Sequence, residues 1–163
     1  MLHPHHAAHA VHDRSDDKVA KLKTHCRALG ERLSTTRLRV FEALSRSHTA
    51  LSAYELQTEL AKNGHLLKPP SIYRALDFLT SQGFAHRIES ESRFVPCCHP
   101  RQQHTSAFAV CTTCHKVREI SGPLLPETLT DQLKTDGFLE EKSVIEILGR
   151  CRDCSTSQVT PHS

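Results

Sequence analysis

Two Cys-x-x-Cys pairs constrain this chain more than any other feature of its sequence. Cys111 and Cys114 form the first pair, Cys151 and Cys154 form the second, and 36 residues separate them. Zinc is satisfied by four thiolates in a tetrahedron, and each pair supplies two sulfurs at the required angle. A structural zinc ion would therefore tie the C-terminal segment back onto a β-strand across an intervening helix. Two redox dithiols are the alternative, but neither pair lies beside a thioredoxin-like strand–helix–strand pattern.

The bulk composition fits one ordinary domain or two small ones. The 163 residues are 37% hydrophobic, which is adequate for compact cores. The N-terminus lacks the apolar stretch of a secretory signal, and no run of about 18 apolar residues occurs. We therefore expect a soluble cytoplasmic protein without membrane contact. The seven cysteines of a chain in that reducing compartment favour metal or redox chemistry over disulfides.

Charge is distributed unevenly along the chain. Residues 18–87 hold 12 Lys and Arg against five Asp and Glu, whereas residues 88–163 hold eight against ten. A basic first segment suits a domain that faces a polyanion, although a solvated basic face without a ligand is the alternative. Residues 1–17 contain five histidines and show no helical or strand period, so we expect a disordered His-rich tail there.

Four short amphipathic helices are predicted in the basic segment. The first begins at Lys18, and Ser34 or Thr35 caps the second. Ser52 precedes the third with Glu55 at the capping-box spacing, and two prolines stand at the entrance of the fourth. The predicted inward faces are Val19, Leu22, Cys26 and Leu29 in the first helix, Leu38, Phe41 and Leu44 in the second, and Ile72, Ala75, Leu76 and Leu79 in the fourth.

Extended chain follows these helices. "FAHRIES" and "RFVPC" are two strand-like runs joined by the polar "ESES", which predicts a hairpin and hence a winged helix-turn-helix domain over residues 18–96. The last helix of such a domain lies in the DNA major groove, where Ser71, Tyr73, Arg74 and Asp77 would be available. Arg74 can bind a guanine edge or a phosphate, and Tyr73 can pack on a thymine methyl. The alternative is a surface pair between Arg74 and Asp77, but the basic segment favours DNA.

The remaining chain predicts a small α/β domain. Its elements are strands around 106–110 and 116–120, a helix between Gly122 and Ser143, and an edge or interface strand in "SVIEILGRC". We expect this domain over residues 106–154, after a hinge at 97–105 and before a second disordered tail at 155–163. Its leftover apolar surface predicts a two-fold dimer interface. The fold class is thus α/β (α+β), with an N-terminal winged helix and a C-terminal dimerisation domain.

A second set of metal-binding residue types comes from both sides of the domain boundary. His86 lies in the wing, a Cys-Cys-His run at 97–99 follows its last strand, and His104 and Glu119 flank the strands of the first Cys-x-x-Cys pair. Two imidazoles, one thiolate and one carboxylate suit zinc, because the two anionic ligands neutralise the ion. Such a site would clamp the two domains, so that metal occupancy selects the orientation that fits DNA.

Six motifs resemble the ferric uptake regulator family and, within it, the zinc uptake regulator subgroup. They are "STTRLRVFEAL", "KPPSIYRALDFL", "GFAHRIES", "HTSAFAVCTTC", "KVRE" and "CRDC", and they run from about Leu33 to Cys154. The resemblance implies a homodimeric, metal-dependent repressor that binds double-stranded operator DNA.

The resemblance also implies a role for particular residues. The regulatory zinc ligands are His86, Cys97, His104 and Glu119, and the structural zinc ligands are Cys111, Cys114, Cys151 and Cys154, which makes two zinc ions per chain. The expected DNA contacts are Tyr54, Lys68, Ser71, Tyr73 and Arg74. Cys98 or His99 is an alternative to Cys97, because the segment before His104 is about one residue shorter than the family pattern.

A departure from the family pattern indicates which metal is sensed. Iron and peroxide sensors of the family carry a His-rich run ending in His-Asp-His shortly before the first Cys-x-x-Cys pair, where this chain has Ser-Ala-Phe at 106–108. A thiolate in the sensing shell favours zinc over iron(II). We therefore expect a zinc-responsive repressor of zinc uptake and homeostasis genes that binds palindromic operators when loaded.

Three other functions are weighed against this one. An iron- or peroxide-sensing regulator would share the fold, and a zinc-storage or chaperone protein would use the His-rich tail. A zinc hydrolase needs an open water position, which a set of four ligands does not leave. We therefore expect no enzymatic activity and no small-molecule substrate.

Overall fold

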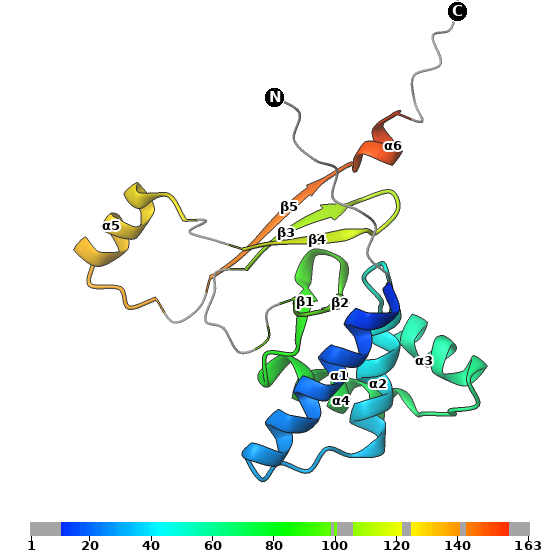
Figure 1. Ribbon diagram of the computed structural model, residues 1–163. Coiled ribbons are helices and arrows are strands. Elements are labelled where there is room, and N and C mark those ends of the chain that lie inside the picture. The colour runs from blue at the N-terminus through cyan, green and yellow to red at the C-terminus, as the bar shows by residue number, and fades with distance from the viewer. Residues whose placement is uncertain (1–10, 99, 101–105, 122–124, 141–142, 157–163) are drawn as a thin grey trace, which may run out of the picture.

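The computed structural model describes residues 11–98, 100, 106–121, 125–140 and 143–156. Its helices and strands are α1 (Val11–Ala28), α2 (Thr35–Arg46), α3 (Ala53–Lys62), α4 (Pro69–Ser81), β1 (Ala85–Ile88), the 3-10 turn η1 (Glu89–Glu91), β2 (Arg93–Pro96), β3 (Ser106–Cys111), β4 (Val117–Ser121), α5 (Glu127–Thr135), β5 (Val144–Gly149) and α6 (Arg152–Thr156). Figure 1 shows the four first helices on one side of the β1–β2 hairpin and the three-stranded sheet on the other. The mixed architecture agrees with the predicted fold class.

Three helices of the first domain, α2, α3 and α4, begin where the sequence predicts. The Ser34 hydroxyl accepts from the Arg37 N–H at 3.3 Å at the start of α2. Ser52 and Glu55 form the predicted capping box of α3, with both reciprocal hydrogen bonds present. Pro69 opens α4, where its fixed φ suits the first helical turn. Local capping therefore sets the boundaries of three helices around one core.

The core of this domain confirms most of the predicted apolar faces. All four residues predicted for α4 are buried, as are Phe41 and Leu44 of α2, and Val40 is buried beside the half-buried Leu38. The prediction for Leu29 is wrong, because its side chain is 58% exposed. α1 ends at Ala28, so Leu29 lies beyond the last turn and no longer follows the helical period.

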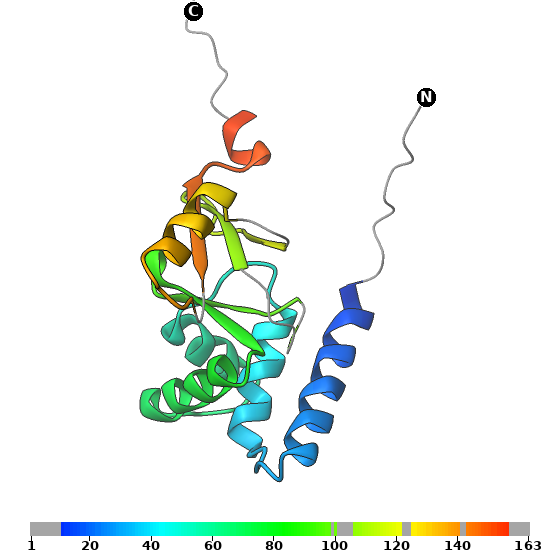
Figure 2. The ribbon, with the colours of Figure 1, turned by 90° about the vertical axis from the view of Figure 1, so that its left-hand side faces the viewer.

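α1 also begins earlier than predicted. The helix starts at Val11, so the predicted tail boundary before Lys18 falls within a helix, and only residues 1–10 of that tail lie outside the described residues. An i,i+4 ion pair between Asp17 and Lys21, at 2.8 Å, lies in the middle of this helix. Figure 2 shows α1 lying along α2 at the edge of the helical domain. No helix among the described residues is long and apolar enough to cross a membrane.

The hairpin connects the helical domain to the sheet. β1 and β2 are antiparallel, with His86 opposite Val95, and Leu51 forms an isolated bridge with Phe94. A small apolar cluster then crosses the boundary, and its buried members are Ala50, Ile88, Val95, Phe108 and Val110. The predicted wing is thus packed against β3, which fixes how the predicted metal-binding residues of the two domains face one another.

The second domain is built on a sheet of order β4-β3-β5. β4 is antiparallel to β3, whereas β5 is parallel to it after the crossover that contains α5. β5 is an edge strand, as predicted, and its Val144, Ile147 and Leu148 are 44%, 54% and 53% exposed in the single chain. α5 projects to one side of the sheet (Figure 1). An apolar edge of this kind is the type of surface that a second copy of the chain can cover.

Candidate metal centres and nucleic-acid interface

The four cysteines of the two Cys-x-x-Cys pairs converge at one end of the sheet. The Sγ atoms of Cys111, Cys114, Cys151 and Cys154 all lie within 4.8 Å of one another. Cys114 Sγ and Cys151 Sγ are 3.7 Å apart. Sulfur atoms about 2.3 Å from a tetrahedral zinc ion lie about 3.8 Å from each other, which is close to the Cys114–Cys151 separation, so the four thiols are grouped as a zinc site requires. The described thiols form no disulfide.

The parallel pairing of β3 and β5 brings these two segments together. Cys111 ends β3 opposite Gly149 of β5, and the Thr112 N–H donates to the Gly149 carbonyl at 2.9 Å. The chain then turns so that the Cys151 N–H points at Cys111 Sγ, 3.4 Å away. The register of one strand pair therefore places the second Cys-x-x-Cys pair over the first.

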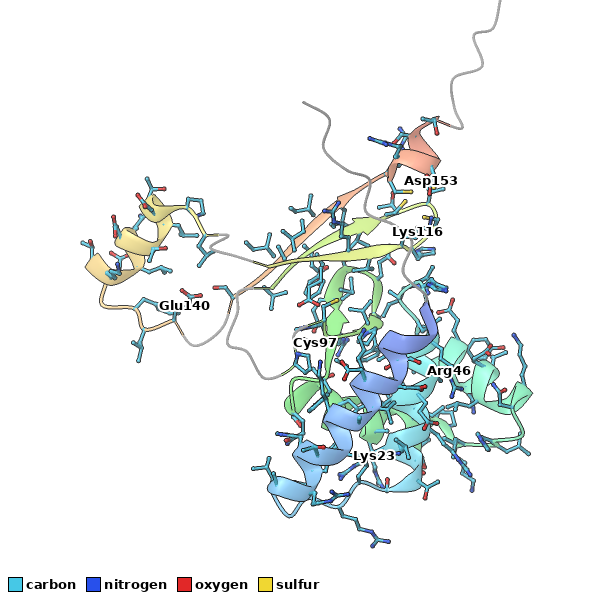
Figure 3. The ribbon with its side chains drawn as sticks, viewed as in Figure 1. Lys23, Arg46, Cys97, Lys116, Glu140 and Asp153 are labelled. Carbon is cyan, nitrogen blue, oxygen red and sulfur yellow. The ribbon has the colours of Figure 1, made fainter. Side chains whose placement is uncertain are left out.

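Neighbouring groups shift the pKa values of these thiols in opposite directions. Backbone N–H groups, first that of Cys151, lower the pKa of Cys111 to about 6. Hydrogen bonds to the neighbouring thiols Cys151 and Cys114 raise the pKa of Cys154 to about 12. Lys116 forms an exposed ion pair with Asp153 at 2.8 Å and lies at the same end of the sheet (Figure 3). The Asp153 carboxylate raises the pKa of Lys116, and the nearby Cys114 and Cys151 contribute in the same direction.

A second cluster lies at the boundary between the domains. His86, Cys97 and Glu119 each offer a ligand atom, and these atoms lie within 4.8 Å of one another. His86 Nε2 is 3.4 Å from Glu119 Oε1, and the two side chains are 14% and 4% exposed. Cys97 is 2% exposed and lies between the helical domain and the sheet (Figure 3). A neutral imidazole, a thiolate and a carboxylate form a mixed donor set that suits zinc.

Cys97, Cys98 and His99 are the three residues that the sequence offers for one ligand position, and they differ in the structure. Cys98 is exposed and takes part through its backbone, because its N–H donates to Glu119 Oε2 at 2.9 Å. Cys97 is buried, and its N–H donates to the Phe84 carbonyl at 2.9 Å. His99 and the predicted fourth ligand His104 lie outside the described residues. Cys97 is therefore the cysteine whose side chain faces His86 and Glu119.

Strand geometry explains why residues so far apart in the sequence meet here. His86 is the second residue of β1, Cys97 directly follows β2, and Glu119 lies at the centre of β4 opposite Phe108. The His86 and Phe108 rings lie 5.0 Å apart and close the apolar side of the cluster. The hairpin and the sheet thus each contribute ligands from rigid strands.

Other contacts across the boundary had no signal in the sequence. The Glu146 carboxylate of β5 accepts from the N–H groups of Glu89 and Ser90 in η1, at 2.7 and 3.1 Å. His115 Nδ1 lies 2.7 Å from Glu91 Oε2, within hydrogen-bond distance, and the His115 carbonyl accepts from the Ala50 N–H. Burial alone would raise the pKa of Glu146, but the hydrogen bonds from Ser90 and Glu89 outweigh burial and lower it. The acidic wing turn is therefore held by the second domain.

The predicted DNA-binding residues are all exposed on the helical domain. Tyr54, near the start of α3, is 77% exposed, and Tyr73 of α4 is 52% exposed. Ser71 and Arg74 are exposed on the same helix, and Lys68 is its exposed N-cap residue. The buried residues of α4 alternate with these at helical spacing, so α4 presents a polar face to solvent. Lys68 also lies at the helix end where the macrodipole favours anions.

Known proteins share this architecture over most of the chain. The model of the ferric uptake regulator family matches residues 28–148. The zinc uptake regulation protein of Escherichia coli (strain K12) is 34% identical over 150 residues, which cover 91% of this chain and 87% of that protein. A solved zinc uptake regulator complexed with zinc and DNA gives a TM-score of 0.81 at 33% identity, covering 90% of this chain and 98% of that chain.

A further relative is known in two states. Holo XcZur gives a TM-score of 0.73 at 32% identity over 85% of this chain and 96% of that chain. Apo XcZur gives 0.52 at 32% identity over 88% and 99%. The conformation of the present chain is thus nearer to the holo form. The matched residues and the identity to these relatives show that this chain belongs to the ferric uptake regulator family.

Proposed function

We propose that the protein is a zinc-responsive transcriptional repressor. As a zinc-loaded homodimer it binds palindromic operator DNA and controls genes for zinc uptake and homeostasis. The observation that carries the proposal is the meeting of His86, Cys97 and Glu119 at the domain boundary. A metal ion bound there joins the hairpin next to α4 to the sheet of the second domain, and so sets the orientation of the DNA-binding face.

Two zinc ions per chain are proposed. The four cysteines hold a structural ion, and His86, Cys97 and Glu119 hold a regulatory ion together with His104. The donor sets support different roles, because the tetracysteine ligands come from one domain and the regulatory ligands come from two. Zinc supplies a tetrahedral centre that accepts both sets and has no redox chemistry of its own.

The energy that such a switch needs is available from one coordination sphere. A shift from 1:99 to 99:1 in favour of the DNA-ready form requires about 5.5 kcal/mol of differential zinc binding. Structural zinc sites in small domains contribute about 10–16 kcal/mol in total. The higher TM-score to holo XcZur than to apo XcZur supports a conformation of this chain near the metal-loaded state.

Domain boundaries follow the same proposal. Residues 18–96 act as the DNA-binding domain, 97–105 as the hinge and 106–154 as the dimerisation and metal-binding domain. The exposed apolar side chains of β5 support a two-fold interface on the second domain. Paired domains then present two α4 helices to successive major grooves.

A titration at buffered free metal tests this function. The full-length dimer is added to a fluorescent palindromic promoter fragment, and anisotropy is followed as free zinc rises. We expect affinity to increase about a hundredfold with zinc, as the competent fraction moves from about 1% to 99%. Equal affinity at all zinc levels contradicts the proposal, and a response to iron(II) instead of zinc contradicts the choice of metal.

A further inference from the structure

A line of hydrogen-bonded polar and charged side chains starts beside the tetracysteine cluster. His115 directly follows Cys114 and has a φ of +56°, a left-handed conformation that is uncommon for a side chain other than glycine. Its Nδ1 donates to Glu91 Oε2 at 2.7 Å, since a carboxylate only accepts, and its carbonyl accepts from the Ala50 N–H at 3.2 Å. Backbone and side chain of this residue thus both contact the helical domain.

The line continues through the wing. The Glu91 side chain is only 12% exposed, and its Oε2 also lies 3.5 Å from Arg93 Nε. Arg93 Nη1 donates to the Ala50 carbonyl at 2.9 Å and to Glu55 Oε2 at 2.6 Å. Arg93 is 18% exposed, so these contacts are partly shielded from water. Charge-assisted hydrogen bonds in such surroundings are among the strong ones in proteins.

The line ends at the start of α3. Glu55 Oε2 also accepts from the Ser52 N–H and hydroxyl, both at 2.7 Å, which completes the capping box. Burial alone would raise the pKa of Glu55, but the hydrogen bonds from Ser52 and Arg93 outweigh it and lower the pKa. Tyr54 is the neighbouring residue in the same turn and is 77% exposed. The last member of the line is therefore next to a candidate DNA contact.

We propose that a line of four residues positions the helix-turn-helix for operator binding. The line starts at the turn that carries Cys111 and Cys114, and it consists of His115, Glu91, Arg93 and Glu55, here named the knuckle relay. This inference rests on the proposed function. It gives the tetracysteine centre a second task, because the same turn that holds its first pair also orients the N-terminus of α3. The four residues are positioning residues, since Glu91 and Arg93 act on DNA only through α3.

For removal of a relay carboxylate, the relay and simple electrostatics predict opposite changes in DNA affinity. Removal of a carboxylate from a DNA-binding domain reduces repulsion of phosphates and should tighten DNA binding. Glu91→Ala removes such a carboxylate but breaks the relay between His115 and Arg93. The inference therefore predicts weaker binding, which a change in charge alone does not produce.

Glu89→Ala is a matched control from the same turn. It deletes the same side chain and charge, but within the described part of the chain the Glu89 side chain pairs only with exposed Arg87, at 3.1 Å. Zinc-saturated full-length dimers of both variants are compared by anisotropy on the promoter fragment that the wild type binds. We expect Glu91→Ala to weaken binding about tenfold and Glu89→Ala to change it less than about twofold. Zinc content and melting temperature of each variant are measured alongside. Zinc content should match the wild type, and both variants should stay folded at the assay temperature, although loss of the partly buried Glu91 contacts should lower the melting temperature of Glu91→Ala.

Glu55→Gln supplies a second test, because glutamine keeps the capping box while it removes the ion pair with Arg93. Glu55→Gln alone should weaken binding several-fold, but the double variant Glu91→Ala/Glu55→Gln should bind less than about twofold more weakly than Glu91→Ala, since both changes break one line. The relay is overturned if Glu91→Ala binds as tightly as Glu89→Ala, or if the two changes are additive. Absence of zinc-dependent binding by the wild type instead overturns the proposed function.

Discussion

The two metal clusters use similar chemistry in different surroundings. The tetracysteine ligands all belong to the second domain, at the ends of β3 and β5, whereas His86 and Cys97 face Glu119 from another domain. Under the proposed assignment, loss of metal from the first cluster would release a chain segment from its own domain. Loss of metal from the second would leave both domains folded and free their orientation. The position of the ligands relative to a domain boundary would then decide whether the same ion has a structural or a regulatory role.

Cys111→Ser should have the largest effect. The variant loses a ligand from the structural centre, so the segment after β5 detaches and the dimer dissociates, with a loss of about 5 kcal/mol or more of stability. Zinc counting and size-exclusion chromatography measure the outcome. Cys98→Ser is the control, because the Cys98 thiol is exposed. A Cys111→Ser variant that remains dimeric with full zinc content contradicts a structural role.

Cys97→Ser should separate the two clusters. The dimer and the structural zinc survive, but zinc no longer selects the DNA-ready orientation, and operator affinity falls about a hundredfold at saturating zinc. Anisotropy with the promoter fragment gives the measurement. Normal zinc-dependent binding by Cys97→Ser, together with its loss in Cys98→Ser, would show that the wrong cysteine is assigned to the regulatory site.

Arg74→Ala tests the DNA-binding face that the regulatory cluster is proposed to orient. A side chain that binds a base edge contributes about 1–3 kcal/mol, so operator affinity should fall by roughly ten- to a hundredfold. Lys134→Ala, on exposed α5, removes the same charge far along the chain from α4 and should have little effect. Equal losses in both variants would indicate a general effect of charge and no specific contact at Arg74.

Glu146→Gln tests the contact between β5 and the wing turn and should have the smallest effect. The Glu146 carboxylate accepts hydrogen bonds from two backbone N–H groups of the wing turn. A neutral side chain in its place should therefore destabilise the packing of the wing turn against β5 by about 1 kcal/mol. The pKa of Glu146 is lowered in this arrangement, so its contribution is present above the ordinary pKa of a glutamate and is lost as pH falls through the lowered value. Small-angle scattering between pH 5 and pH 3 should show domains separating on acidification in the wild type, with a weaker dependence in Glu146→Gln.

The capped helices and the strands of this fold were predictable because their signals are local. Ser52 and Glu55 are three residues apart, and the Ser34 cap is adjacent to its helix. Leu29 was predicted wrongly because the sequence pattern does not show that α1 ends one residue earlier. The start of α1 at Val11 was missed for a related reason, since the polar residues before Lys18 show no helical spacing of apolar residues.

The two metal clusters were predictable to different degrees. Four cysteines in two pairs identify a zinc site directly, whereas the regulatory set needed the resemblance to a family to choose among adjacent ligand types. The relay residue Glu91 and the Glu146 contact carried no signal, because their partners lie 24 and 57 residues away and depend on how two domains dock. Contacts of this kind follow from tertiary structure alone.

One measurement tests the distinction between the clusters most directly. Native mass spectrometry counts zinc per chain across a series of buffered free-zinc concentrations, while anisotropy records operator binding in the same samples. We expect one zinc per chain throughout and a second that appears over the same concentration range as DNA binding. Full operator affinity with one zinc per chain, or a second zinc that leaves affinity unchanged, would contradict a regulatory ion at His86, Cys97 and Glu119.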